Sequence, residues 1–186
     1  MKKKMALLSS ALIFASVAQV ANAGTGKIDI EGGVSDTTCT VTVNNTTGGN
    51  ATVVLPMVRP AALDAPGKTA GRAFLNFELS GCASAATLAS TARVYFLASQ
   101  DINSEGRLSN TAATNGVENV DIEVLNSDLS SINLTNTSPQ HTTVANITGT
   151  SGTAKASIRH FVQYYATGKA TPGRVTANLE YNIEYQ

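Results

Sequence analysis

The sequence predicts an all-β fold, a sandwich or a barrel, from three observations. No stretch has the apolar period of a long helix. Short segments with period-two alternation follow one another, separated by clusters of glycine, asparagine, serine, threonine and proline. Beyond residue 23, both ends of the chain carry a well-patterned strand without an obvious neighbour. A strand that lacks a neighbour at one end and a spare strand at the other indicate subunits that complete one another.

Residues 1–23 have the features of a secretory signal peptide. Three lysines precede a mostly apolar run over residues 5–20, and Ala21-Asn22-Ala23 has the small residues of a cleavage site. An N-terminal membrane anchor is the alternative, but the apolar run is short and ends in small residues rather than basic ones. Cleavage after Ala23 would leave residues 24–186, enough for one domain and its core.

The charge balance argues against nucleic acid as a partner. Three of the 13 basic residues lie in the leader, so the mature chain has 10 basic residues against 13 acidic ones, a net charge of −3. No basic stripe remains that could neutralise phosphates.

The two cysteines, Cys39 and Cys82, predict one disulfide, because an even number of cysteines in an exported chain is typical of disulfides. The bond would close a loop of about 43 residues and contribute about 3–4 kcal/mol in the chain-entropy model. A metal site is the alternative, and it is disfavoured because no histidine lies near either cysteine.

The strands are expected at short intervals along the chain. They are predicted over residues 38–43, 52–58, 75–82, 92–98, 120–124, 154–166 and 174–185, with a short addition at 132–134. Polar turns or loops are expected over residues 44–50, 61–71, 138–152 and 167–173. No internal repeat or linker interrupts this order, so one domain is expected.

The last strand alternates without a break. One face carries Val175, Ala177, Leu179, Tyr181, Ile183 and Tyr185, and the other carries Arg174, Thr176, Asn178, Glu180, Asn182 and Glu184. The chain therefore ends in a half-buried strand, with no later segment to lie beside it.

The segment around residues 27–34 also alternates, with Ile28, Ile30 and Val34 on one face and Gly32 breaking the apolar series. A sandwich missing one strand exposes a hydrophobic groove and unpaired backbone groups. An extended segment can fill such a groove by strand addition. The alternative is that residues 24–36 form the first strand of their own domain.

No residues form a recognisable catalytic set, metal site or cofactor site. His141 lies in a polar loop and is interpreted as a solvated surface residue. His160 interrupts an apolar face and is interpreted as a histidine at the rim of the core, bonded to a backbone group or water. A role in pH sensing is the alternative. The carboxylates are interpreted as solvated sheet faces rather than paired acid–base groups: Asp121, Glu123, Glu180 and Glu184.

Four sequence features, which follow one another along the chain, together resemble the pattern of one family. They are Gly32-x-Val34 five residues before Cys39, Phe77-Glu-Leu79-Ser-Gly-Cys82, Tyr164-Tyr165-Ala166-Thr167-Gly168 followed by Ala170-Thr171-Pro172-Gly173, and a terminal strand with Gly173 fourteenth from the end and Tyr185 penultimate. The mature chain resembles, along its whole length, the structural subunits of chaperone–usher fimbriae, of the type 1 major pilin kind. It departs from the family pattern at His160, where an apolar residue is more usual.

The resemblance implies an incomplete immunoglobulin-like sandwich that lacks its last strand. A periplasmic chaperone would lend a strand, and at the outer-membrane usher the N-terminal extension of the next subunit would replace it. The implied donor positions are Ile28, Ile30, Gly32 and Val34. The residues implied for the acceptor groove and for chaperone and usher recognition are Gly173, Val175, Ala177, Leu179, Tyr181, Ile183, Tyr185 and Gln186, the last through its free carboxylate.

The sequence thus predicts a signal peptide over residues 1–23, a donor-strand extension over 24–36 and a pilin domain over 37–186. The expected function is a structural subunit that is exported through the periplasm, polymerises with identical copies into a surface fimbria and supports cell adhesion. A minor adaptor or tip subunit of the same system, and a secreted enzyme on a β-sandwich, are the alternatives.

Overall fold

The computed structural model describes residues 38–83, 90–136 and 140–186. Two antiparallel sheets make up this part of the chain. The larger sheet has the order β2 (Thr46–Thr47), β1 (Thr38–Val43), β3 (Thr69–Ala83), β8 (Ala154–Ala166), β6 (Val120–Leu125) and β5 (Leu108–Ser109). The smaller sheet has the order β7 (Val144–Asn146), β4 (Thr91–Phe96) and β9 (Tyr181–Tyr185).

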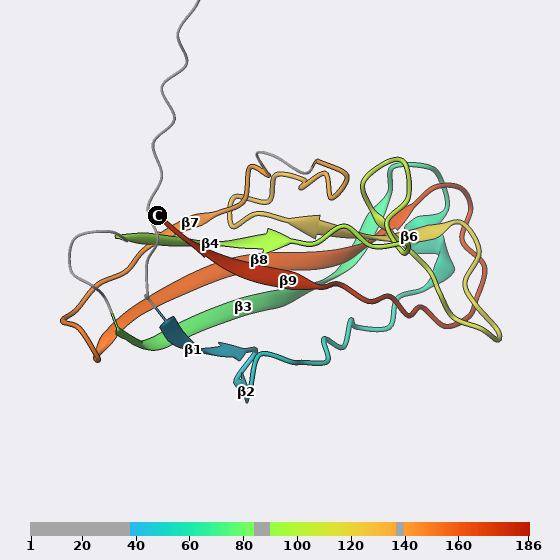
Figure 1. Ribbon diagram of the computed structural model, residues 1–186. Coiled ribbons are helices and arrows are strands. Elements are labelled where there is room, and N and C mark those ends of the chain that lie inside the picture. The colour runs from blue at the N-terminus through green and yellow to red at the C-terminus, as the bar shows by residue number, and fades with distance from the viewer. Residues whose placement is uncertain (1–37, 84–89, 137–139) are drawn as a thin grey trace, which may run out of the picture. The chain divides into compact units, whose positions relative to one another are not determined.

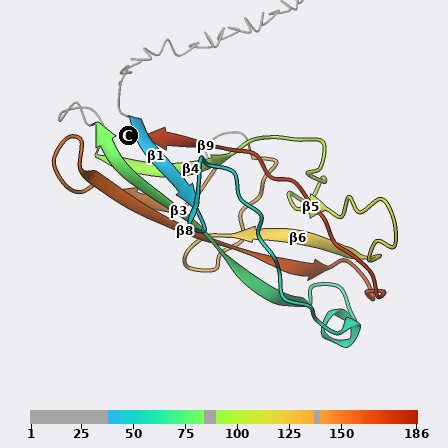
Figure 2. The same ribbon diagram turned by 90° about the horizontal axis from the view of Figure 1, so that it is seen from below.

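The long strands β3 and β8 form the centre of the larger sheet and lie side by side in both views (Figures 1 and 2). Every second side chain along these two strands faces the smaller sheet, as the period-two pattern predicts. The core between the sheets is apolar and includes Leu75, Phe77, Leu79, Val94, Phe96, Val124, Leu134 and Ile158.

The predicted disulfide between Cys39 and Cys82 is confirmed. It joins β1 to β3, with 4.1 Å between the two Cα atoms, and Cys82 is fully buried. The bond lies where the β1–β3 register shifts, between the Thr38–Ala83 pair and the Thr40–Ser80 pair. It therefore ties the start of the described domain to the end of a central strand.

Two short strands lie in stretches that the sequence predicts to be polar turns or loops. β2 forms a hairpin with β1 inside the predicted turn at 44–50, and β7 pairs with β4 inside the predicted loop at 138–152. These strands have two and three residues, too few to show a period of their own. In the described part of the chain, one 3₁₀ helix, η1 (Pro60–Leu63), follows the segment that contains Pro56.

The prediction of a paired strand at residues 52–58 is wrong. Val53 and Leu55 are half-buried and pack against the core, as alternation predicts, but the segment forms no ladder with any described strand. Pro56 has no N–H to donate, which weakens any ladder at that end. Residues 132–134 likewise form no named strand, although Ile132 and Leu134 are buried.

The described residues include no helix with the length and apolar composition needed to span a bilayer. The predicted signal peptide and donor-strand extension lie outside the described residues.

Candidate functional site

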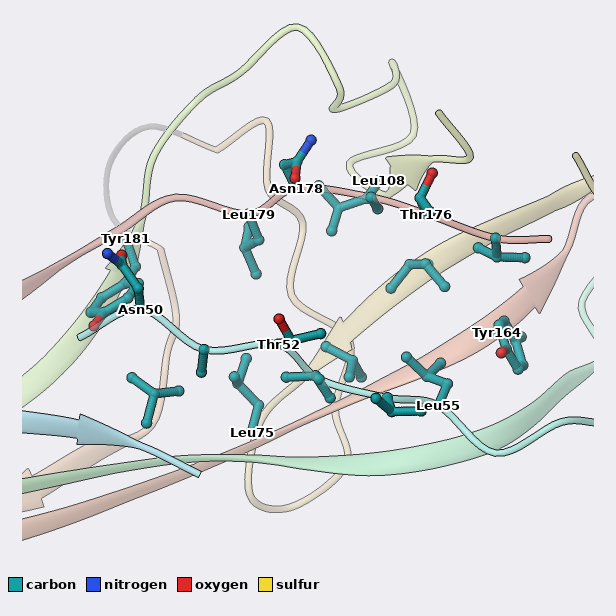
Figure 3. A pocket seen from close by; sticks show the side chains of 18 of the residues that line it. Asn50, Thr52, Leu55, Leu75, Leu108, Tyr164, Thr176, Asn178, Leu179 and Tyr181 are labelled. Atoms are coloured by element: carbon teal, nitrogen blue, oxygen red, sulfur yellow. The ribbon is translucent and has the colours of Figure 1, made fainter. Parts of the chain in front are cut away.

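An apolar groove of about 690 Å³ runs beside the segment that leads into β9 (Figure 3). One wall is formed by residues 174–181 and the other by residues 49–55. The floor consists of core side chains from the larger sheet and its neighbours: Val43, Leu75, Phe77, Leu108, Ile122, Val162 and Tyr164. The groove is therefore a long opening into the hydrophobic core of the domain.

The first wall is strand-like but has a free edge. Val175, Ala177 and Leu179 are half-buried, whereas Thr176 and Asn178 are exposed and point away from the groove (Figure 3). Toward the outside, the carbonyl of Thr176 accepts a hydrogen bond from the backbone N–H of Thr111 at 2.8 Å. Within the described residues, the backbones of Val175, Ala177 and Leu179 form no hydrogen bond. Because alternate residues point their N–H and C=O groups to opposite edges, these unpaired groups face the groove.

The second wall, residues 49–55, is extended too. Val53 and Leu55 are directed toward the core cluster, and Val54 between them is 82% exposed. Within the described part of the chain, no backbone hydrogen bond is made by residues 51–58. The groove thus separates two extended segments that both have backbone groups to pair, at a place where the floor is apolar.

Tyr181 joins the two walls at one end of the groove. Its hydroxyl donates a hydrogen bond to the carbonyl of Gly49 at 2.6 Å, and its ring meets that of Phe77 edge to face with 4.8 Å between centroids. Burial raises the pKa of the Tyr181 phenol, which keeps the hydroxyl protonated as a donor. Tyr164 lines the groove farther along, and burial raises the pKa of its phenol also.

The structure separates the predicted groove residues into three groups. Val175, Ala177, Leu179 and Tyr181 line the groove. Gly173 instead lines a smaller apolar cavity of about 260 Å³, which shares Tyr164 and Val175 with the groove. Ile183 and Tyr185 are part of β9, pair with β4 and pack against the core cluster. The donor positions Ile28, Ile30, Gly32 and Val34 lie outside the described residues.

The carboxyl end of Gln186 is held by the chain itself. One oxygen accepts hydrogen bonds from the backbone N–H groups of Ser90 and Thr91, both at 2.7 Å, and from the Thr91 hydroxyl at 3.2 Å. The backbone N–H of Gln186 donates to the Thr91 carbonyl at 2.9 Å. Successive N–H groups that converge on one oxygen are a favourable site for an anion.

Sequence reasoning missed the second wall and the floor residues Leu108, Ile122 and Tyr164. The alternation of Val53 and Leu55 is the available signal for the wall, but alternation by itself indicates an ordinary strand. The floor residues belong to strands far apart in the sequence, so no local pattern indicates that they share one opening.

The interpretation of His160 as a rim residue is wrong, because its side chain is fully buried between the rings of Phe77 and Phe96. Nδ1 lies 3.2 Å from the Leu125 carbonyl. Since that oxygen can only accept, Nδ1 carries the hydrogen. Within the described residues Nε2 has no hydrogen-bond partner. Burial is the main cause that lowers the pKa of His160 from 6.5 to about 4.

The interpretation of the carboxylates as solvated is wrong for Glu123. Its side chain is buried on the outer side of β6, where it accepts hydrogen bonds from Gln163 at 2.8 Å and Ser131 at 2.9 Å. Asp121 pairs with Arg107 at 3.1 Å, and Glu184 pairs with Arg93. The part of the chain that the structure describes contains no group of three or more histidine, cysteine, aspartate or glutamate residues placed to hold a metal ion.

Residues 55–186 match the family described as "Type-1 fimbrial protein, A". The chain is 38% identical to the F17 fimbrial protein of Escherichia coli over 166 residues, covering 87% of each chain. It is 34% identical to the major fimbrial subunit SMF-1 of Stenotrophomonas maltophilia over 182 residues, covering 93% of this chain and 99% of the relative.

The fold is similar to that of a subunit in a solved chaperone–usher pilus. The TM-score is 0.55 at 16% identity, covering 91% of this chain and 100% of the other. The prediction of an immunoglobulin-like sandwich that lacks a strand is therefore confirmed. Taken with the sequence matches to fimbrial relatives, this shows that the chain belongs to the family of type-1 fimbrial proteins.

Proposed function

We propose that this subunit polymerises into a surface fimbria by donor-strand exchange, each copy inserting residues 24–36 into the groove of a neighbour. The observation that carries the proposal is the groove itself. Two extended segments, one on each side, have backbone groups without partners in the described residues, and the apolar core lies open between them. This arrangement provides both the hydrogen bonds and the buried surface that strand addition requires.

The donor extension has the pattern that such a groove needs. Ile28, Ile30 and Val34 lie on one face of an alternating segment. Full burial of three such side chains contributes roughly 5–9 kcal/mol before any backbone bonding. This is comparable to the stability of an entire domain. Gly32 suits a position where the partner's backbone approaches closely.

In this proposal the chain follows the route of its family. Residues 1–23 direct export, a periplasmic chaperone fills the groove of the newly folded domain 37–186, and an outer-membrane usher exchanges the chaperone strand for the next subunit's extension. The carboxylate of Gln186 serves in chaperone recognition. The groove residues Val175, Ala177, Leu179 and Tyr181 form the acceptor wall, with Gly173, Ile183 and Tyr185 bordering it.

We assign the subunit to the main shaft of the fimbria, where many identical copies support adhesion by holding the tip away from the cell. Its similarity over nearly the full length of a protein named as a major fimbrial subunit supports this role. Counting copies per fibre by quantitative mass spectrometry tests the assignment. One or a few copies would indicate a minor adaptor or tip subunit instead.

A gel of protein sheared from the cell surface tests donor-strand exchange. Samples are run in SDS without heating and again after boiling in acid, and a ladder that collapses to one band is expected. Ile30→Asp should remove the ladder, whereas Asp29→Asn, on the other face of the same segment, should keep it. A monomer band alone in both lanes of the unaltered protein would instead indicate that residues 24–36 complete their own domain.

A further inference from the structure

The first wall of the groove is bound along its outer edge by the loop that follows β5. This loop, residues 110–117, is here called the clamp loop. The backbone N–H of Thr111 donates to the Thr176 carbonyl at 2.8 Å, and that of Val117 donates to the Arg174 carbonyl at 2.9 Å. The wall is therefore attached, on the side away from the groove, to a segment that is distant in the sequence.

Asn110, the first residue of the clamp loop, bonds to the wall and to the loop through its side-chain amide. Oδ1 accepts hydrogen bonds from the backbone N–H groups of Thr176 at 3.0 Å and Ala112 at 3.1 Å. Nδ2 donates to the carbonyls of Arg174 at 2.9 Å and Val117 at 3.0 Å. Both hydrogens and both lone pairs of the amide are thus used. These four bonds fix the orientation of the amide, because turning it over would break all of them.

The outward-facing backbone groups of Arg174 and Thr176 all have partners. Their carbonyls are bound by the clamp loop, the Arg174 N–H donates to the Asn115 carbonyl at 2.7 Å, and the Thr176 N–H donates to Asn110. Val175, between them, makes no backbone hydrogen bond within the described residues, and its N–H and C=O face the groove. The start of the wall is therefore held along one edge and open along the other.

No named strand of the described residues pairs with this part of the wall. The ladder between β4 and β9 covers only Tyr181–Tyr185. After Thr176, the next backbone hydrogen bond of the wall within the described residues is the one that the Glu180 carbonyl accepts from the Leu97 N–H at 2.9 Å. Ordering a free segment into an extended strand costs conformational entropy. A wall that is already ordered by the clamp loop binds an incoming strand with a smaller loss.

We infer that Asn110 is a positioning residue for donor-strand binding. Its amide has the same kinds of donor and acceptor groups as a peptide bond, so it acts as the missing strand partner for the outer edge of residues 174–176. The inner edge is thereby held extended and free. The inference rests on the proposed function, and it assigns a role to a residue that is not among those lining the groove.

Hydrogen exchange of sheared fibres, measured by mass spectrometry, tests the inference. Asn110→Asp keeps the size of the side chain but removes both donors and turns a carboxylate oxygen toward two carbonyls. Exchange over residues 174–180 and 24–36 should become about tenfold faster than in unaltered fibres, the effect of losing one or two hydrogen bonds. Exchange at the centres of β3 and β8 should stay unchanged, because the opening is local.

Asn126→Asp is the matched control, because the Asn126 amide also joins two segments through backbone groups. Nδ2 donates to the His141 carbonyl at 2.8 Å, and Oδ1 accepts from the Thr143 N–H at 2.8 Å. None of these three residues lines the groove. Asn126→Asp should speed exchange in its own segments and leave residues 174–180 and 24–36 as they are in unaltered fibres. A general loss of stability is thereby distinguished from displacement of the wall.

Thr111→Val is a second, milder test of the same edge. The Thr111 hydroxyl donates to the Thr176 carbonyl at 3.1 Å, and the substitution removes this bond but keeps the backbone bond to the same carbonyl. Exchange over residues 174–180 should rise in these fibres too, by less than in Asn110→Asp fibres. This variant decides the question if Asn110→Asp subunits do not enter fibres, and unchanged exchange of the wall would then overturn the inference.

Two further outcomes overturn the inference. In the first, Asn110→Asp speeds exchange in the clamp loop alone, which would limit the amide to the folding of that loop. In the second, Asn126→Asp speeds exchange of the wall and of residues 24–36 as much as Asn110→Asp does, so that the effect reports general stability. Absence of protection over residues 24–36 in unaltered fibres would instead reject the proposed function.

Discussion

The side-chain amide of Gln140 forms two hydrogen bonds with the backbone of Phe96. The Phe96 N–H donates to Oε1 at 2.9 Å, and Nε2 donates to the Phe96 carbonyl at 2.6 Å. β7 pairs with β4 only from Thr91 to Arg93, so the amide serves as a strand partner farther along the same edge. Gln140 is 2% exposed, and this pairing satisfies polar groups of both residues away from water.

Replacing Gln140 with leucine should therefore destabilise the domain by about 2–4 kcal/mol, because the Phe96 N–H and C=O would stay buried without partners. Thermal unfolding of purified fibres, followed by circular dichroism, measures the effect. Gln100→Leu is the matched control, since Gln100 is exposed and should leave the unfolding temperature nearly unchanged. Equal shifts for the two variants would contradict the role assigned to the amide.

Acid should weaken the domain through His160. Burial lowers its pKa in the folded state to about 4, whereas the unfolded chain titrates near the ordinary value of 6.5. Between these values the unfolded state binds more protons, so stability falls as the pH drops from about 6.5 to about 4. The loss from this group is at most about 3 kcal/mol.

The unfolding temperature of fibres, measured from pH 7 to pH 4, checks this pH dependence. His160→Met should flatten the part of the curve between pH 6.5 and pH 4, although it changes the packing against Phe77 and Phe96 at every pH. His141→Gln should leave the curve as it is, because His141 is exposed. An unchanged acid slope in the His160 variant would show that other groups cause it.

The two sides of the segment that leads to β9 should respond differently to the same substitution. Leu179→Arg places a charged side chain in the groove, where it would block an incoming strand and remove the multimer ladder. Asn178→Arg places it on the exposed side and should keep the ladder (Figure 3). Retention of the ladder in Leu179→Arg fibres would mean that donor strands bind elsewhere.

Gly173 should be needed for its small size. A Cβ at this position would lie 2.5 Å from the Asn115 carbonyl oxygen and 2.8 Å from the Val117 backbone nitrogen. These residues hold the start of the groove wall, because Arg174 bonds to both backbones. Gly173→Ala should therefore lower the free energy of unfolding by about 1–3 kcal/mol and displace the groove wall at residues 174–181.

Gly152→Ala is the comparison variant, because its expected loss of stability is similar. A Cβ there meets nothing within 4 Å, but φ is +80°, so alanine costs about 1–2 kcal/mol through backbone strain. Subunit incorporation into fibres, measured at equal expression, should fall in Gly173→Ala and not in Gly152→Ala. Equal incorporation of the two variants would show that the wall tolerates the displacement.

The alternation of apolar and polar residues was sufficient to predict the strands that pack one face against the core. β1 has the predicted bounds, β8 spans the predicted 154–166, and the half-buried positions of residues 175–183 follow the alternation. Of the strand predicted at 174–185, however, only Tyr181–Tyr185 pairs with another strand. The pattern failed for residues 52–58, because alternation reports burial of one face and says nothing about whether an edge is paired. It also failed for Gln140, whose role depends on a strand more than 40 residues away.

The sequence by itself determined the strand faces and the disulfide. These depend on a period of two and on cysteine count, which are local or compositional. Only the tertiary structure decided that residues 49–55 and 174–181 border one groove, that His160 is enclosed by Phe77 and Phe96, and that Glu123 is buried. Those features depend on how segments distant in sequence pack in three dimensions, and the spacing of residues along one strand carries no record of that packing.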